Sequence, residues 1–475
     1  MSELVFMPLR EMADGIRARR ISPVELVEAH IERIKRIGPK LNAFVHTDFE
    51  GARRDAKAAE AAVRTSSAGS LGPLHGIPIT IKSSIDVAGF PAPCGSRLRR
   101  DYVARADAPL VLRLRAAGAI ILGNTNVPEF LMAYETDNLL QGRTNSPWDL
   151  SRTPGGSSGG EAAAIASGCS AGGIGSDGGG SIRIPAHYSG ICGLKPTPGR
   201  VPSTGHFPGS AGPFAYLGVV GPMARRVGDV EMIFSAIAGP DAGDPCAARV
   251  PLRSWTEDEA RKLRVGYFED DGATPVTAET GEAVRRAAEL LRERGFQAEP
   301  WRPDNLDRVW KIWWNLFGRA GQMAFSPMQR GRDADFSPTY KDFRARVAVE
   351  PPLGGEELLD TLIERDVLRA RFLAKMEEFP ILLCPVCAIP AFRHGEREWM
   401  VRDHCVQYLK AMSYSQWFNV LGNPGVSVPA GRSPEGLPIG VQIVARPWED
   451  EAALAVAARI EEACGGFRAP ALNFA

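Results

Sequence analysis

The stretch TPGGSSGGEAAAIASGCSAGGIGSDGGGSIRIPA, from Thr153 to Ala186, has the most unusual composition in the chain. Eleven of the 26 residues from Gly155 to Gly180 are glycine. Glycine loses more backbone freedom on folding than any other residue, and in exchange it allows sharp turns and close approach to another group. We therefore expect this segment to shape a functional loop.

Two common motifs match inside the stretch. Gly173-Ile-Gly-Ser-Asp-Gly178 fits the dinucleotide pattern G-x-G-x-x-G, which requires a helix directly after it. Pro185 argues against a helix there, so a nucleotide site is disfavoured. Gly156-Ser-Ser-Gly-Gly160 fits the nucleophile elbow G-x-S-x-G, but the polar residues 145–154 before it do not resemble the buried strand that an elbow follows. An elbow also requires a histidine, and four are candidates: His187, His206, His394 and His404.

A third interpretation fits the glycines better. The run Gly178-Gly179-Gly180 frees the backbone to turn several N–H groups toward one point, as an oxyanion hole for acyl transfer requires. Ser181 follows directly and places a hydroxyl beside those donors. Asp177 and Arg183 flank the loop with opposite charges, and we expect them to pair and brace it; a solvated surface pair is the alternative.

The stretch resembles the signature of the amidase signature family, serine amidohydrolases with a Ser–cis-Ser–Lys triad. The resemblance covers nearly the whole chain. Its motifs follow in order as Pro73–Lys82, Gly155–Glu161, Gly175–Ala186, Gly193–Arg200, Gly221–Arg225 and Gly422–Pro429.

The resemblance implies the residue roles. Ser181 is the expected nucleophile, Ser157 the bridging serine after a cis peptide bond, and Lys82 the base, which must be neutral to accept a proton. The apolar run before Lys82 favours its burial, which lowers a lysine pKa. The N–H groups of Gly178, Gly179, Gly180 and Ser181 are the expected oxyanion hole, with Ser158, Asp177 and Arg183 supporting the loop. No metal and no organic cofactor are implied.

The resemblance also implies the reaction class, hydrolysis of carbon–nitrogen bonds through an acyl-enzyme. The substrate is expected to be a small-molecule amide, anilide, ester or carbamate (urethane). One alternative is the glutaminase subunit of a tRNA-dependent amidotransferase complex, although the segment 202–213 is similar to that of stand-alone amidases. A histidine-dependent esterase and a catalytically inactive binding homologue are the other two.

The order of expected elements predicts an α/β fold. Helices are expected at 22–38, 50–63, 107–115, 280–294 and 449–464, with a long helical region over 303–376 broken near Pro351; strands are expected at 77–81, 119–122, 263–268, 381–384, 426–429 and 439–445. Alternating helices and apolar strands favour a buried sheet covered on both faces. Together with the resemblance, this predicts an α/β/α sandwich around a large mixed, twisted sheet, as a single domain over residues 1–475.

The balance of charged residues bears on which kinds of molecule the chain can bind. Lys+Arg and Asp+Glu number 56 each among 475 residues, which favours neither nucleic acid nor an anionic membrane. The N-terminus has no signal-peptide pattern and no apolar run is long enough for a membrane span, so we expect a cytoplasmic enzyme; a homodimer is left open. Of the eight cysteines, only Cys384 and Cys387 have ligand-like spacing, and without a second pair a zinc site is disfavoured.

One aromatic stripe invites a separate prediction. Its members follow helical spacing: Leu306, Trp310, Trp313, Trp314 and Phe317. A helix packed on the core would explain the spacing. The functional alternative is that part of the stripe walls the substrate pocket, since aromatic walls suit aryl groups.

Overall fold

In the computed structural model, which describes residues 4–65, 67–209 and 211–472, eleven strands form one mixed sheet in the order β1-β3-β2-β4-β6-β5-β12-β13-β9-β7-β8. These strands are β1 Phe44–Thr47, β2 Pro78–Lys82, β3 Ile120–Thr125, β4 Gly172–Asp177, β5 Cys192–Lys195, β6 Val219–Ala224, β7 Val265–Tyr267, β8 Ala298–Pro300, β9 Ile381–Pro385, β12 Gly425–Arg432 and β13 Pro438–Ala445. A separate hairpin joins β10 Glu398–Val401 to β11 His404–Gln407.

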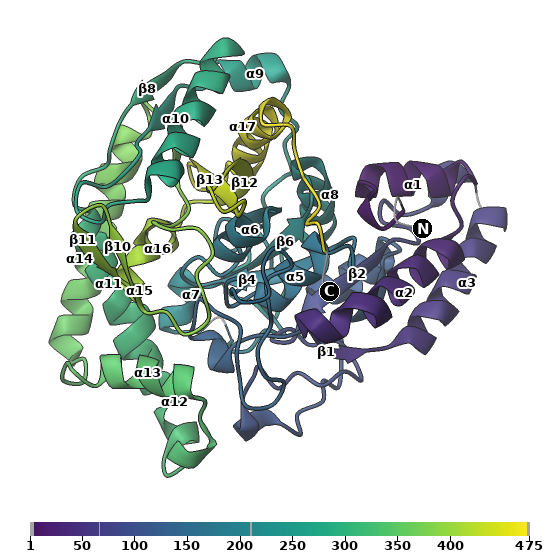
Figure 1. Cartoon of the computed structure of the whole chain (residues 1–475), viewed down its shortest axis with the longest axis horizontal. Helices are drawn as coiled ribbons and strands as arrows, with labels where there is room; N and C mark the ends of the chain where they lie inside the picture. Colours follow the sequence, from purple (N-terminus) through teal and green to yellow (C-terminus); the bar gives the residue numbers. More distant parts are fainter. Residues whose placement is uncertain (1–3, 66, 210, 473–475) are drawn as a thin grey trace.

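Helices surround the sheet (Figure 1). They are α1 Leu9–Arg17, α2 Pro23–Leu41, α3 Phe49–Thr65, α4 Pro109–Ala116, α5 Gly159–Ala166, α6 Arg183–Ser189, α7 Pro213–Leu217, α8 Val227–Ile237, α9 Glu257–Arg261, α10 Ala278–Glu293, α11 Leu306–Trp313, α12 Gly321–Gln329, α13 Pro338–Val347, α14 Gly355–Lys375, α15 Tyr408–Ala411, α16 Ser413–Val420 and α17 Asp450–Ala463. A π-helical segment, Trp314–Ala320, joins α11 to α12. Short 3₁₀ turns lie at Leu4–Phe6, Ala68–Ser70, Arg97–Arg99, Glu129–Leu131 and Asp333–Asp335.

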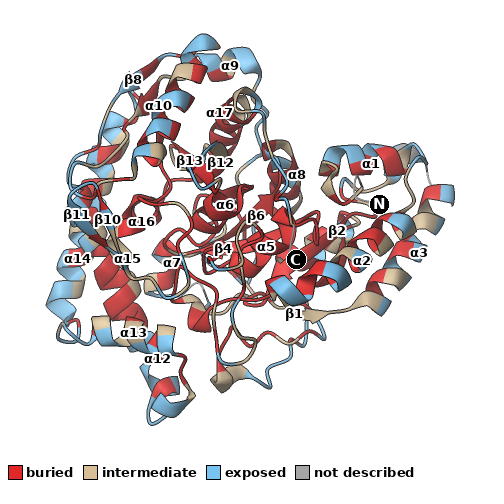
Figure 2. Cartoon of the chain, viewed as in Figure 1, coloured by how far each residue is buried: buried red, intermediate tan, exposed pale blue. Residues whose placement is uncertain are grey.

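Strand β13 shows how the two faces of the sheet differ. Its alternate residues Ile439, Val441 and Ile443 join the apolar core that α8, α10 and α17 share. Gln442, between them, points to the opposite face, where its neighbour is Arg183 of α6. The period of two thus directs one apolar set to this layer of helices and Gln442 to the other. Figure 2 shows the central strands and α5 and α6 buried, whereas the exposed residues lie on the outer helices and loops.

The predicted α/β fold around a large mixed sheet is confirmed. One local prediction was wrong. The stretch after Gly180 does contain a helix, α6, with Pro185 in its first turn, where the N–H that proline lacks would meet Ser181, before the helix, and not a residue of α6 itself. The region 303–376 is helical and is broken near Pro351 as predicted, between α13 and α14; it has a further break between α12 and α13, and a π segment joins α11 to α12.

The parallel pairing of β2 with β3 and β4 sets the position of the site. Because β2 and β4 run in the same direction, their carboxyl ends lie at the same edge of the sheet. Lys82 ends β2 and Asp177 ends β4. The lysine motif and the glycine-rich loop therefore meet in space although 95 residues separate these two ends in the sequence.

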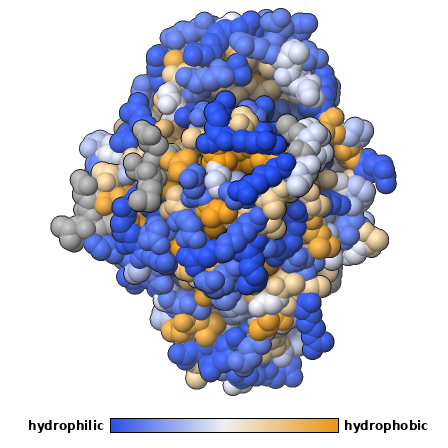
Figure 3. All heavy atoms as spheres, turned by 90° about the vertical axis from the view of Figure 1, so that its right-hand side faces the viewer, coloured by the Kyte–Doolittle hydropathy of each residue, from blue (hydrophilic) through white to orange (hydrophobic). Residues whose placement is uncertain are grey.

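The surface seen from the N-terminal side is largely hydrophilic, with apolar side chains gathered in its middle (Figure 3). No helix of the described residues combines the length and the apolarity that crossing a membrane requires. Nor do the described residues bring three histidine, cysteine or acidic side chains together as a metal site would need.

Candidate active site

Lys82 is fully buried at the end of β2 and lies among serine side chains. Its Nζ is 2.6 Å from Ser157 Oγ, 2.8 Å from Ser158 Oγ and 3.0 Å from Ser176 Oγ. Burial lowers its pKa from the ordinary 10.5 to about 7, against the opposing effects of Asp177 and Glu161. Lys82 is therefore a lysine that can exchange a proton near neutral pH.

Ser157 and Ser158 come from the loop before α5, where the Gly156–Ser157 peptide bond is cis, as predicted. Close contacts explain the glycine at 156: a Cβ there would lie 2.5 Å from the Ala133 carbonyl oxygen. Ser158 also accepts from the Ser176 N–H at 3.3 Å, so this loop is tied to the end of β4.

Ser181 precedes α6, and because residue 185 is a proline, the Ser181 carbonyl is free to accept a hydrogen bond from outside the helix. In a helix, the N–H of residue 185 would donate to the carbonyl of residue 181. Proline has no N–H, and the Ser181 carbonyl instead accepts from the Ser158 N–H at 3.2 Å. Pro185 thereby allows a direct backbone hydrogen bond between the loop of Ser158 and the loop of Ser181.

Aromatic side chains hold the peptide units of the glycine loop. Trp313 Nε1 donates to the Gly178 carbonyl at 3.0 Å, and the Tyr134 hydroxyl donates to the Gly179 carbonyl at 2.8 Å. A Cβ on Gly179 would lie 2.9 Å from both aromatic side chains, and Gly180 has φ of +116°. The loop therefore requires glycine at 179 for space and at 180 for conformation.

Asp177 binds the C-terminal end of the glycine loop through its carboxylate. Its carboxylate accepts from the Gly180 N–H at 2.7 Å and from the Ile182 N–H at 3.1 Å. The Gly180 N–H thus points to Asp177 and is not free for an oxyanion, which removes one of the four predicted donors.

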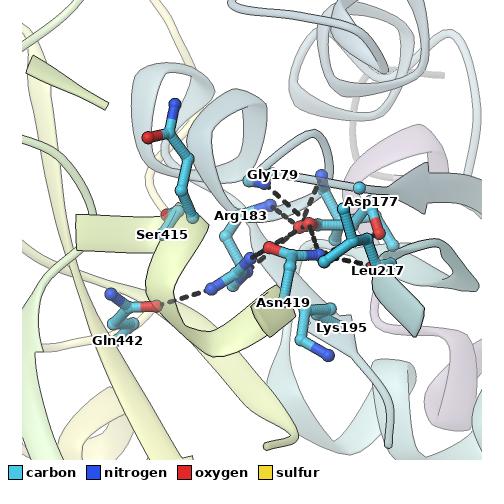
Figure 4. Close-up of polar contacts among 12 residues, drawn as sticks. Asp177, Gly179, Arg183, Lys195, Leu217, Ser415, Asn419 and Gln442 are labelled. Atoms are coloured by element: carbon cyan, nitrogen blue, oxygen red, sulfur yellow. Dashed lines mark hydrogen bonds and ion pairs between the residues drawn. The ribbon is translucent and has the colours of Figure 1, made fainter. Parts of the chain in front are cut away.

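Asp177 and Arg183 form the predicted pair, and it is completely buried, which excludes the solvated alternative. Figure 4 shows that this pair belongs to a network reaching the C-terminal half: Arg183 donates to Asn419 of α16 at 2.7 Å and to Gln442 of β13 at 3.0 Å. Burial alone would raise the pKa of Asp177, but the Arg183 guanidinium and the Gly180 N–H hold it well below its ordinary value. Asp177 is therefore a fixed anion.

A pocket opens over these residues and encloses about 460 Å³ of space free of atoms, part of it open to solvent. Ser157, Ser181 and Gly178 line it together with apolar walls. The apolar lining residues are Phe130, Leu131, Met132, Pro208, Phe214, Val219 and Phe317. Asp177 is the charged residue among those that line it in the described part of the chain, and it is already paired.

The residues of the aromatic stripe differ in position: one lines the pocket, and others pack away from it. Phe317, in the π-helical segment, lines the pocket, and its ring stacks on Trp313 with centroids 4.9 Å apart. Trp314 stacks on Trp310 and donates to Glu350 at 2.8 Å, away from the pocket lining. Phe317 therefore lines the pocket, as the wall interpretation requires of part of the stripe, whereas Trp310 and Trp314 pack elsewhere.

The candidate histidines do not complete an esterase triad. His187 is buried against the backbone of Ile389 and Gly440, and burial lowers its pKa to about 4. His394 lies beside Asn145, and His404 is exposed on the hairpin. His206 does line the pocket, but both ring nitrogens are engaged: Nδ1 lies 2.8 Å from the Pro208 carbonyl and Nε2 lies 3.1 Å from Ser84 Oγ.

Comparison with known proteins agrees with this geometry. The family model described as Amidase matches residues 25–454. The chain belongs to the amidase signature family. It is 35% identical to an indoleacetamide hydrolase of Bradyrhizobium diazoefficiens, over 96% of this chain and 86% of that protein. It is 33% identical to a glutamyl-tRNA(Gln) amidotransferase subunit of Roseiflexus castenholzii, over 96% of this chain and 95% of that protein.

Among solved structures, a bacterial aryl acylamidase of the amidase signature family superposes with a TM-score of 0.85 at 27% identity, covering 96% of each chain. Like its relatives, this amidase is an enzyme that hydrolyses carbon–nitrogen bonds of amides.

Four side chains at the site were not predicted from the sequence: Tyr134, Ser176, Asn419 and Gln442. Ser176 had a usable signal, since it lies inside the glycine-rich stretch directly before Asp177. The other three are separated from the loop by tens to hundreds of residues, and ordinary helix, strand or loop contexts surround them.

Proposed function

We propose that this amidase hydrolyses neutral amides with an apolar or aromatic acyl group, through an acyl-enzyme on Ser181. The observation that carries the proposal is the buried Lys82, whose pKa is about 7 and whose Nζ is 2.6 Å from Oγ of Ser157, a serine that lines the same pocket as Ser181. A neutral amine so placed can accept a proton through the Ser157 hydroxyl.

The proposed reaction has two steps. Ser181 Oγ attacks the amide carbonyl carbon while its proton passes to Ser157 and the Ser157 proton passes to Lys82. The proton returns to the leaving nitrogen as the carbon–nitrogen bond breaks, which releases the amine and leaves an ester on Ser181. Water then attacks that ester by the same relay and releases the carboxylic acid.

The developing oxyanion is proposed to lie against the glycine loop. With the Gly180 N–H directed to Asp177, the N–H groups of Gly178, Gly179 and Ser181 are the proposed donors. The carbonyls of Gly178 and Gly179 are held by Trp313 and Tyr134. Because a peptide unit is planar, fixing one carbonyl fixes the direction of the N–H on the same unit. Trp313 thereby orients the Gly179 N–H, a proposed donor, whereas Tyr134 orients the Gly180 N–H that Asp177 accepts from. Preorganised donors of this kind contribute about 3–4 kcal/mol each to transition-state stabilisation.

The pocket lining supports the substrate class. Its walls are apolar and aromatic, and its carboxylate is committed to Arg183. An aryl or hydrophobic acyl group gains contact there, and the same attack serves an ester or carbamate with that group. One relative is named an indoleacetamide hydrolase, and the aromatic indole group in that name is consistent with an aryl substrate here.

The glutaminase alternative rests on the relatives that are amidotransferase subunits. Free glutamine carries an ammonium and a carboxylate, and a pocket that selects it needs charged partners for both. The lining among the described residues offers neither a free cation nor a free anion, which disfavours glutamine.

A paired assay tests the proposal. The purified enzyme is first labelled with a fluorophosphonate and the modified residue is located by mass spectrometry; label on Ser181, absent in Ser181→Ala, is expected. Hydrolysis of an aryl acetamide, a short aliphatic amide, a phenyl carbamate and glutamine is then compared. Turnover should be fastest for the aryl acetamide, and preferred release of ammonia from glutamine would overturn the substrate class.

A further inference from the structure

Helix α14 lies on the outer edge of the molecule, away from β4, α5 and α6 (Figures 1 and 2), and exposes a row of apolar side chains. Leu359 is 58% exposed, Ile363 54% and Val367 45%. Ala370 and Ala374 continue the same line and are also exposed. These five residues, the α14 stripe, recur at i, i+4, i+8, i+11 and i+15, so they lie on one helical face. Single exposed apolar residues are common, but an ordered stripe of them marks a binding surface.

The charges beside the stripe indicate what fits it. Asp360 and Arg371 lie on the same side of the stripe, the acid in the N-terminal half of the helix and the base in the C-terminal half. Neither forms an ion pair within the part of the chain that the structure describes. A helix with this pattern is complementary to itself in antiparallel orientation, because the acidic half of one copy then faces the basic half of the other.

We propose that α14 pairs with α14 of a second copy of this chain across a two-fold axis. The midpoint between Asp360 and Arg371 falls between Ile363 and Val367, the centre of the stripe. One axis therefore brings Asp360 opposite the partner subunit's Arg371 and buries the apolar residues between the two ion pairs. Such a self-complementary contact is isologous, so it closes as a dimer and does not propagate.

A membrane surface fits this face less well. Helices that lie on anionic bilayers place lysine and arginine beside their apolar face. Here Glu356, Asp360 and Asp366 are exposed along α14 and would be repelled. The same residues do not disfavour a second copy, because the antiparallel arrangement sets Arg371 against the acidic half of the helix.

Sedimentation velocity over a range of protein concentrations tests the proposal. The wild-type chain is expected at twice its monomer mass, and Ile363→Glu at the monomer mass, with association weakened by about 100-fold or more. Met400→Glu, at a 70% exposed position on the β10–β11 hairpin, is the matched control and should remain dimeric. All these variants should retain amide hydrolysis, since none alters the pocket.

A charge exchange makes the test specific to the antiparallel register. Asp360→Arg alone should weaken the dimer, and the double variant Asp360→Arg/Arg371→Asp should restore it. A wild-type chain that is monomeric at every concentration, a dimer that persists in Ile363→Glu, or a monomer that sediments with phosphatidylglycerol vesicles would each overturn the proposal.

Discussion

Trp313 Nε1 lies 3.0 Å from the carbonyl oxygen of Gly178, so a side chain from the second half of the chain holds the loop that carries Ser181. The same peptide unit contains the N–H of Gly179, a proposed oxyanion donor. Trp313 thus acts on that donor through the backbone, and touches the glycine loop without lining the pocket.

Trp313→Phe should separate this hydrogen bond from simple packing, because phenylalanine keeps much of the stacking on Phe317. One hydrogen bond contributes about 1 kcal/mol, so kcat should fall roughly fivefold with little change in KM. Trp314→Phe is the matched control: it removes the hydrogen bond to Glu350 and should leave kcat unchanged. Equal losses of kcat in the two variants would mean that Trp313 serves the core and not the loop.

Replacement of the triad should be non-additive. Ser181→Ala, Ser157→Ala and Lys82→Ala are each expected to lower kcat by several orders of magnitude, and the triple variant should be little worse than the most severe single one, because the three act as a unit. Ser203→Ala is the control, since Ser203 also lines the pocket but is not among the partners of Lys82. Steady-state amide hydrolysis measures this, and near-normal turnover by Ser181→Ala would refute the nucleophile.

The pH dependence of kcat/KM should report the Lys82 amine. Catalysis requires its neutral form, so activity should be low where the amine is protonated, rise about tenfold per pH unit below its pKa, and level off above about pH 7. Burial also lowers the pKa of Lys195 to about 7, so a second group titrates in the same range. Lys195→Met tells them apart: the rise should persist in this variant, and its disappearance would assign the step to Lys195.

The reactive residues could be predicted because each lies inside a local pattern. Lys82 ends an apolar run, Ser157 lies among four glycines and Ser181 follows three, and their order along the chain is the family's order. The period-two and period-3.6 patterns likewise indicated most strands and helices and hence a sheet covered on both faces. One sheet contains strands from β1, near the N-terminus, to β13, near the C-terminus. This is consistent with a single domain, which stays a prediction.

The features that were not predicted from the sequence depend on contacts between distant segments. Pro185 locally indicates the absence of a helix, yet its position in the first turn of α6 made it compatible with one. Asn419 and Gln442 reach Arg183 from 236 and 259 residues away, and nothing near them in the sequence indicates that contact. The aromatic stripe predicted a helix, but its spacing alone does not tell which of its rings reaches the pocket; Phe317 does so, from the π-helical segment.

Asp177→Asn should reduce both stability and rate, because it leaves the Arg183 guanidinium buried without its anion. Loss of one partner of a buried pair costs about 3–5 kcal/mol, and the Gly180 contact that shapes the loop weakens with it. Urea denaturation should show the lower free energy of unfolding, and kcat should fall by about tenfold or more at temperatures where the variant is folded. Glu299→Gln, in the half-exposed pair with Arg264, should change either quantity little. A fully stable Asp177→Asn would mean that the network does not depend on its charge.

Phe317→Ala should change substrate selectivity, because Phe317 is the ring of the stripe that lines the pocket. Removing an aromatic wall from an apolar pocket costs about 1–3 kcal/mol of binding for a group that fills it. We therefore expect kcat/KM for an aryl amide to fall by about 10- to 100-fold and that for a short aliphatic amide to change much less. Trp310→Ala is the control on the same helical stripe: its ring packs on Trp314 and under Lys410, so stability should fall while the ratio of the two substrates stays constant. If both variants lower the two substrates in equal proportion, Phe317 supports the fold and the acyl group binds elsewhere in the pocket.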